Sequence, residues 1–141
     1  MSYIINLKIE NSTHNEYLTI IEKTVYGCGG WTEHNNEHDF DTTSNSTSGI
    51  LRFRSSKNEL FTVAVGIHNW KPWGDVQVDL GERDTALSLN PQYYGSASRL
   101  HREWYQDKAR PTKTGKSVKI TFAAPPPEGH VFYGVISYSY S

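Results

Sequence analysis

One short run of residues carries most of the groups that could do chemistry. Residues 66–75 contain an imidazole, an amide, two indoles and a carboxylate. They directly follow residues 61–65, an apolar segment that predicts a strand. Aromatic rings beside planar hydrogen-bonding groups suit a polar ligand that has one apolar face. A sugar is the commonest ligand of that kind.

Residues within and beyond this run supply both kinds of contact. Asn69, Asp75 and Arg99 can each make paired hydrogen bonds to neighbouring hydroxyls or to an acetamido group. Other residues could stack on the apolar face of a pyranose. They are Trp70, Trp73, Trp104 and Tyr105. The residues alone support equally well a second interpretation, in which Trp70 and Trp73 fill one end of the core.

The remaining reactive residue types give no positive support for catalysis. His34 and His38 lie in a predicted loop or strand and would not share a helical face, so we expect them and His14 to be exposed. Cys28 has no basic residue close in sequence that would lower its pKa. The glycines around it lack the Lys-Ser/Thr pair of a phosphate-binding loop. We therefore expect no enzymatic activity, no metal and no cofactor.

Composition and charge restrict the function further. A chain of 141 residues is expected to form one domain, residues 1–141, with a sizeable core. A net charge of −1 argues against nucleic acid or an anionic membrane as partner. Lys108, Arg110, Lys113 and Lys116 are scattered among turn residues and predict a solvated loop. The single cysteine and the absence of an apolar leader predict a cytoplasmic protein without disulfides or a transmembrane span.

The expected elements are strands, then a helical insert, then strands. Strands are predicted at residues 3–10, 17–25, 38–43, 50–54, 60–69, 76–80, 117–123 and 130–140. The first two are expected to pair as a hairpin, and residues 27–30 to be irregular because of their glycines. Helical segments are predicted at residues 82–89, 90–94 and 98–108. This order favours a mainly β fold, a β-sandwich with a small helical appendage.

Several motifs follow one another along residues 2–110. They are Glu22-Lys23-Thr24-Val25, Gly29-Gly30, residues 47–53, residues 62–71, Thr85-Ala86-Leu87 and residues 90–94. In order and spacing they resemble the fungal fruit-body lectins of the common-mushroom type. The resemblance implies an actinoporin-like β-sandwich of two sheets connected by a short helix-loop-helix. It also implies a homotetramer, no metal, and two separate sugar sites per chain.

The resemblance further implies which sugars bind and where. One family site prefers galactose-type sugars, including N-acetylgalactosamine and the Thomsen–Friedenreich disaccharide; the other prefers N-acetylglucosamine. The residues assigned to the first site are Gly27, Cys28, Asn45, Ser46, His68, Asn69 and Trp70. Those assigned to the second site are Trp73, Asp75, Val76, Val78, Arg99, Trp104 and Tyr105. The family's glycine-rich loop is replaced here by residues 43–49, and a family threonine by Val78.

Three functions are compatible with these observations. The leading one is a lectin that binds glycans of glycoproteins or glycolipids, with a role in defence against grazing animals. The second is an actinoporin-like pore former with a membrane-facing aromatic patch. Against it, Tyr3 already belongs to a predicted strand, which leaves no amphipathic helix to insert, so no membrane insertion is expected. The third is a storage protein that has kept the fold and lost sugar binding.

Overall fold

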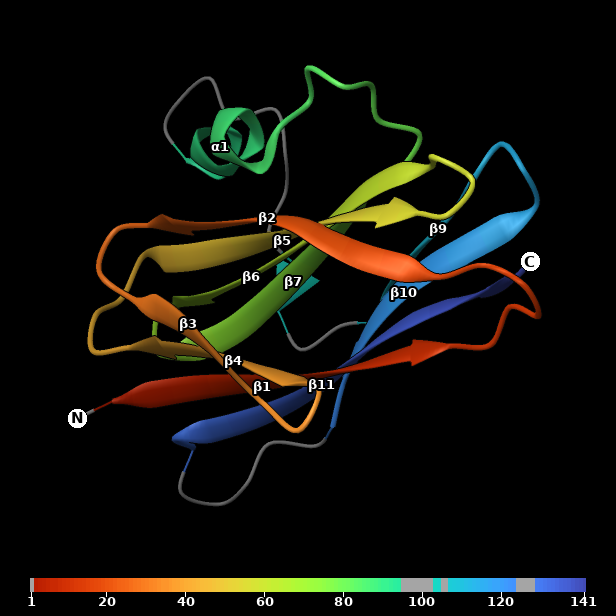
Figure 1. The fold of residues 1–141 in the computed structure, drawn as a ribbon. Coiled ribbons are helices and arrows are strands. Elements are labelled where there is room, and N and C mark those ends of the chain that lie inside the picture. Colours follow the sequence, from red (N-terminus) through yellow and green to blue (C-terminus); the bar gives the residue numbers. More distant parts are fainter. Residues whose placement is uncertain (1, 95–102, 105–106, 124–128) are drawn as a thin grey trace.

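The computed structural model describes residues 2–94, 103–104, 107–123 and 129–141, which form two packed β-sheets (Figure 1). The strands are β1 (Tyr3–Asn11), β2 (Leu18–Tyr26), β3 (Gly30–His34), β4 (Glu37–Thr42), β5 (Thr47–Ser55), β6 (Leu60–His68), β7 (Lys71–Gln77), β8 (Glu103–Trp104), β9 (Lys108–Pro111), β10 (Lys116–Phe122) and β11 (Val131–Tyr140). One sheet has the order β3-β4-β1-β11-β10-β9 and the other β2-β5-β6-β7-β8. The predicted β-sandwich is confirmed.

Two hydrophobic clusters hold the layers together. The larger lies between the sheets and combines residues such as Ile5 and Leu7 of β1 with Phe53 of β5. The smaller lies on the other face of the five-stranded sheet, under α1 (Ala86–Leu89) and the 3-10 turn η1 (Asn90–Tyr93). Strand β6 is therefore buried on both faces. This explains why its sequence is continuously apolar instead of alternating.

The predicted hairpin between the first two strands is wrong. Strand β1 pairs in antiparallel with β4 and in parallel with β11, whereas β2 pairs with β5 in the other sheet. The connection between β1 and β2 crosses from one sheet to the other and carries Glu16, which is buried. Alternating apolar residues identify a strand but do not identify its partner, so the error lies in topology and not in the elements.

Several element boundaries also differ from the prediction. Strand β7 begins at Lys71 and not at residue 76, so the aromatic run forms a hairpin with β6. Strands β3 and β9 were not predicted because both are short and rich in polar residues. The helix expected at residues 98–108 lies mostly outside the described residues, and its described parts include β8 and the first residue of β9. Within the described ranges no helix is long and apolar enough to cross a membrane.

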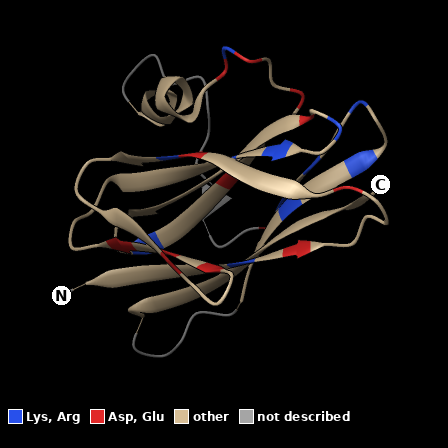
Figure 2. Ribbon diagram, viewed as in Figure 1, with Lys and Arg blue, Asp and Glu red and all other residues tan. Residues whose placement is uncertain are grey.

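Two predictions of exposure are wrong as well. Lys116 was expected in a solvated loop, but it is buried and its Nζ lies 2.9 Å from Oε2 of Glu16. His38 is buried, because it faces the space between the sheets from β4. Elsewhere acidic and basic residues are interspersed over strands and loops (Figure 2), which agrees with the near-balance of charge.

Candidate functional site

Connections from one end of the sandwich bring together the residues assigned to the first site. Strands β2, β5, β6 and β7 are neighbours in one sheet, so the end of β2, the start of β5 and the β6–β7 turn lie at the same edge. We call this set the loop-end site: Gly27, Cys28, Asn45, Ser46, His68, Asn69 and Trp70. Its members are separated in sequence and adjacent in the fold.

The β6–β7 turn has an unusual backbone. Asn69 and Trp70 have φ values of 50° and 61°, both in the left-handed region. Such a two-residue connection is the kind that matches the twist of a β-hairpin, but left-handed backbone is costly for a tryptophan. The turn is held by the loop between β4 and β5, because the Trp70 N–H donates to Oδ1 of Asn45 at 2.8 Å. The Ser46 N–H likewise donates to the Ile67 carbonyl at 2.9 Å.

A buried threonine connects the remaining loop to this arrangement. The Thr42 hydroxyl donates to the Cys28 carbonyl at 2.6 Å and accepts from the Ser44 N–H at 3.1 Å. Thr42 is 2% exposed, so these hydrogen bonds are shielded from water. The sequence contained no signal for this role, because Thr42 ends an ordinary strand. It fixes the β2–β3 loop beside the β4–β5 loop.

The loop-end site presents an aromatic surface beside polar groups. The Trp70 side chain is 50% exposed, and its ring centroid lies 5.2 Å from that of Tyr3. Tyr3 comes from the start of β1 in the opposite sheet and was missed by sequence reasoning. Asn69 and Ser46 are exposed next to this surface, and His68 is half-buried at the end of β6. An exposed indole with amide and hydroxyl groups can bind a polyol that has one apolar face.

The second predicted set lies on β7 and around it. Asp75 is buried, and its Oδ2 accepts from the Tyr93 hydroxyl at 2.7 Å and from Gln77 Nε2 at 2.8 Å. Burial, and then the charge of Asp75, raise the pKa of Tyr93 far above its ordinary value, so the phenol stays protonated as a donor. Trp73 is fully buried, with its ring centroid 5.1 Å from that of Tyr93.

The other members of this set are placed unevenly. Val76 belongs to the main core, and Val78 is half-buried against it. The backbone of Trp104 in β8 pairs with Trp73, while Arg99 and Tyr105 lie outside the described residues. Across the described part of the chain, no group of three or more His, Cys, Asp or Glu residues could hold a metal ion.

Comparisons with known proteins agree with this architecture. A family model described as fungal fruit body lectin matches residues 1–132. The lectin of Boletus edulis is 44% identical over 105 residues, which cover 72% of this chain and 73% of that protein. The crystal structure of a mutated Xerocomus chrysenteron lectin is similar with a TM-score of 0.91 and 34% identity, covering 99% of both chains. The wild-type form of that lectin has a TM-score of 0.88 and 34% identity, covering 99% of this chain and 100% of its own.

Proposed function

The chain belongs to the fungal fruit body lectin family and is a carbohydrate-binding lectin, and from this premise we propose which glycans it binds. We propose that the loop-end site takes galactose-type sugars, including N-acetylgalactosamine and the Thomsen–Friedenreich disaccharide. A second site around Asp75 takes N-acetylglucosamine-type ends. Both sites bind without catalysing a reaction.

The observation that supports the first assignment best is the fixed position of Asn69. Its left-handed turn is bonded to the neighbouring loop, so the backbone of Asn69 is held in place and its side chain is exposed before any ligand arrives. Trp70 offers an apolar face beside it. A few neutral hydrogen bonds contribute about 1 kcal/mol each. One site should therefore bind a monosaccharide with a dissociation constant of roughly 1 mM.

The second assignment rests on the position of Asp75 in the family pattern and on its surroundings. Tyr93 and Gln77 both bond to Oδ2, which fixes the carboxylate on β7 next to β8. Asp75 itself is buried, so its role in the proposed site is to hold Tyr93 and Gln77 in place through these hydrogen bonds. The hydroxyl that family members have at the position of Val78 is absent, so this site relies on fewer side-chain contacts.

We further propose that the chain assembles as a homotetramer and serves in defence against grazing animals. Weak single sites become effective when several sit on one assembly, because each later binding event is intramolecular. Sedimentation equilibrium would measure the assembly, and a monomer at working concentration would contradict this part of the proposal.

A glycan array of the wild type, two site variants and one control variant tests the site assignment. Asn69→Gly removes the amide yet permits the left-handed backbone, so the turn should survive. Asn58→Gly is the matched control, because Asn58 also has a positive φ, 64°, at the opposite end of β5 and β6. Asp75→Asn keeps the shape of the side chain and removes its charge.

The expected result separates the two sites. Asn69→Gly should lose galactose-type ends and keep N-acetylglucosamine ends, Asp75→Asn should show the reverse, and Asn58→Gly should match the wild type. Unchanged galactose-type binding by folded Asn69→Gly would refute the loop-end assignment. A blank array from folded wild type would instead favour a protein that has kept the fold and lost its sugar sites.

A further inference from the structure

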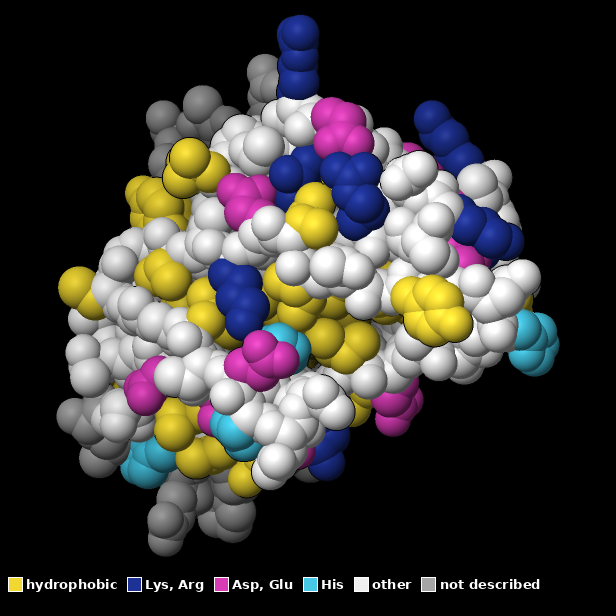
Figure 3. All heavy atoms as spheres, in the orientation of Figure 1, with side chains coloured by type: hydrophobic (Ala, Val, Ile, Leu, Met, Phe, Trp, Pro, Cys, Tyr) yellow, Lys and Arg dark blue, Asp and Glu magenta, His cyan; other side chains and the backbone are white. Residues whose placement is uncertain are grey.

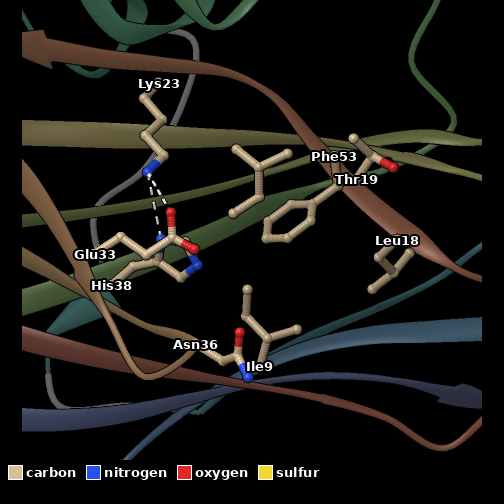
Figure 4. A pocket seen from close by; sticks show the side chains of 9 residues that line it. Ile9, Leu18, Thr19, Lys23, Glu33, Asn36, His38 and Phe53 are labelled. Carbon is tan, nitrogen blue, oxygen red and sulfur yellow. Dashed lines mark hydrogen bonds and ion pairs between the residues drawn. The ribbon is translucent and has the colours of Figure 1, made fainter.

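A cleft away from the loop-end site opens between the two sheets. Its volume is about 420 Å³, and it lies between β2 of one sheet and β1, β3 and β4 of the other (Figure 4). This size is within the range of small-molecule sites. Figure 3 shows hydrophobic side chains exposed in the middle of this face, with basic, acidic and histidine side chains beside them. The hollow therefore combines apolar side chains with charged and polar ones.

The apolar part comes from all sides of the cleft. Ile9, Leu18, Ile20 and Phe53 line it. Phe53 is fully buried, whereas the other three are only partly buried and leave carbon surface facing the opening. Partly buried aliphatic side chains that line a hollow gain free energy when an apolar group covers them. Thr19, Asn36 and His38 also line the cleft, so polar side chains share its wall with the apolar ones.

A β-bulge determines which charged residue reaches the cleft. The register between β2 and β5 shifts between Ile20, opposite Phe53, and Glu22, opposite Arg52. Strict alternation from Leu18 and Ile20 would turn Glu22 inward. After the bulge, Lys23 lines the cleft instead, and the Glu22 carboxylate accepts from the Ala86 N–H at 2.8 Å on the outer face. Bulges re-aim side chains in this way next to functional sites.

Lys23 is the cation at the rim, and its present contacts are long. Its Nζ lies 3.8 Å from Oε2 of Glu33 and 3.5 Å from Nδ1 of His38. Charge-assisted hydrogen bonds are normally about 2.7–2.9 Å. Burial, and then the charge of Lys23, lower the pKa of His38, so the imidazole is neutral at pH 7. Glu33 has a side chain that is 55% exposed, so it can swing away into solvent.

We propose that this cleft binds a small amphipathic carboxylic acid, whose apolar body lies between the sheets and whose carboxylate accepts hydrogen bonds from Lys23. An ammonium group has three donors, and a ligand carboxylate at normal distance would satisfy them better than the long contacts do. A cationic amphiphile is disfavoured because its head would meet the lysine. The site is separate from both proposed sugar sites.

Titration calorimetry with sodium octanoate tests the proposal, and 1-octanol serves as a ligand with the same apolar body and no charge. We expect saturable octanoate binding, and octanol binding about tenfold weaker, because a hydrogen bond between charged groups is lost. Lys23→Met keeps the length of the side chain and removes the ammonium, so it should weaken octanoate about tenfold and leave octanol unchanged. Lys57→Met is the matched control, because Lys57 is exposed in the β5–β6 connection.

Several results would overturn the proposal. One is an absence of octanoate binding at concentrations too low for octanoate to form micelles. Another is equal affinity for octanol and octanoate, which would show that the head group is not recognised. Unchanged octanoate binding by Lys23→Met would remove the lysine from the site. Glycan binding by the same samples shows that the protein is folded and separates failure of this proposal from failure of the sugar assignment.

Discussion

A buried ionic cluster lies at the end of the sandwich opposite the loop-end site, and removing one of its members should destabilise the fold. Lys116 Nζ lies 2.9 Å from Glu16 and 3.6 Å from Glu59. The Tyr138 hydroxyl lies 3.0 Å from Oε1 of Glu16 and 2.5 Å from Oε2 of Glu59. One phenolic hydrogen serves two carboxylates, and the ammonium offsets part of their negative charge. Its side chain is 8% exposed and that of Glu16 is 0% exposed.

Lys116→Met should therefore be strongly destabilising. The substitution keeps an apolar stem but leaves the buried Glu16 carboxylate without its cation. Removing one partner of a buried ion pair costs about 3–5 kcal/mol. Because the cluster lies near the end of the sandwich, we expect the lower value, about 3 kcal/mol, which corresponds to a fall in melting temperature of roughly 10 °C.

Urea unfolding followed by tryptophan fluorescence measures this loss at a fixed protein concentration. Lys119→Met is the control, because the Lys119–Asp107 pair spans 3.7 Å with side chains that are 44% and 52% exposed. An exposed pair of this kind contributes less than about 1 kcal/mol. The double variant Lys116→Met with Glu16→Gln should recover part of the loss, because the uncompensated charge is then gone.

The pH dependence gives a second test of the same reasoning. Burial would raise the pKa of Glu16, but hydrogen bonds from Lys116 and Tyr138 and the lysine charge outweigh it, so the pKa lies below its ordinary value of 4.5. A carboxyl whose pKa is lower in the folded state stabilises the fold at pH values above its unfolded-state pKa. This stabilisation is lost as the pH falls through the folded-state pKa. The difference in the free energy of unfolding between wild type and Lys116→Met should therefore become smaller below about pH 4.5. Two results would refute the argument. One is a loss of stability in Lys116→Met no larger than that in Lys119→Met, and the other is a stability difference from wild type that stays constant below about pH 4.5.

Further predictions concern packing, a buried hydrogen bond and a surface histidine. Gly66→Ala should destabilise by about 1–3 kcal/mol, because the added Cβ would lie 2.7 Å from the Trp73 ring; thermal unfolding would measure it. Tyr93→Phe should lower the free energy of unfolding by about 1.5–3 kcal/mol, because it removes a buried hydrogen bond to a carboxylate. Equal stability of the variant and the wild type in chemical denaturation would contradict this. The pKa of His34 should lie above its ordinary value because Asp39 accepts a hydrogen bond from the imidazole, and a titration by NMR should show the shift disappear in Asp39→Asn.

Local patterns predicted most of the strands but little of the sheet order. Alternation along β1 correctly identified the inward face, because side-chain direction in a strand has a period of two. The partner of β1 depends on β11, at the far end of the chain, and no local pattern carries that information. For the same reason the predicted hairpin with β2 was wrong, although both strands were recognised.

The candidate site was predicted in part for a comparable reason. Asn69 and Trp70 stood out because they are consecutive and of suggestive types. Tyr3 and Thr42 did not, since an ordinary strand residue gains a role only from what lies beside it. Trp73 shows the opposite case, because a residue of suggestive type is fully buried.

The sequence by itself determined the β-rich composition, the near-neutral charge and the motifs of the lectin family. Only the tertiary structure decided which loops meet at the end of the sandwich, and that a bulge turns Lys23 into the cleft while Glu22 caps α1. The physical reason is that strand formation depends on neighbouring residues, whereas sheet order and packing sum many contacts between residues far apart in the chain. A site built from such contacts exists only after the whole fold has formed.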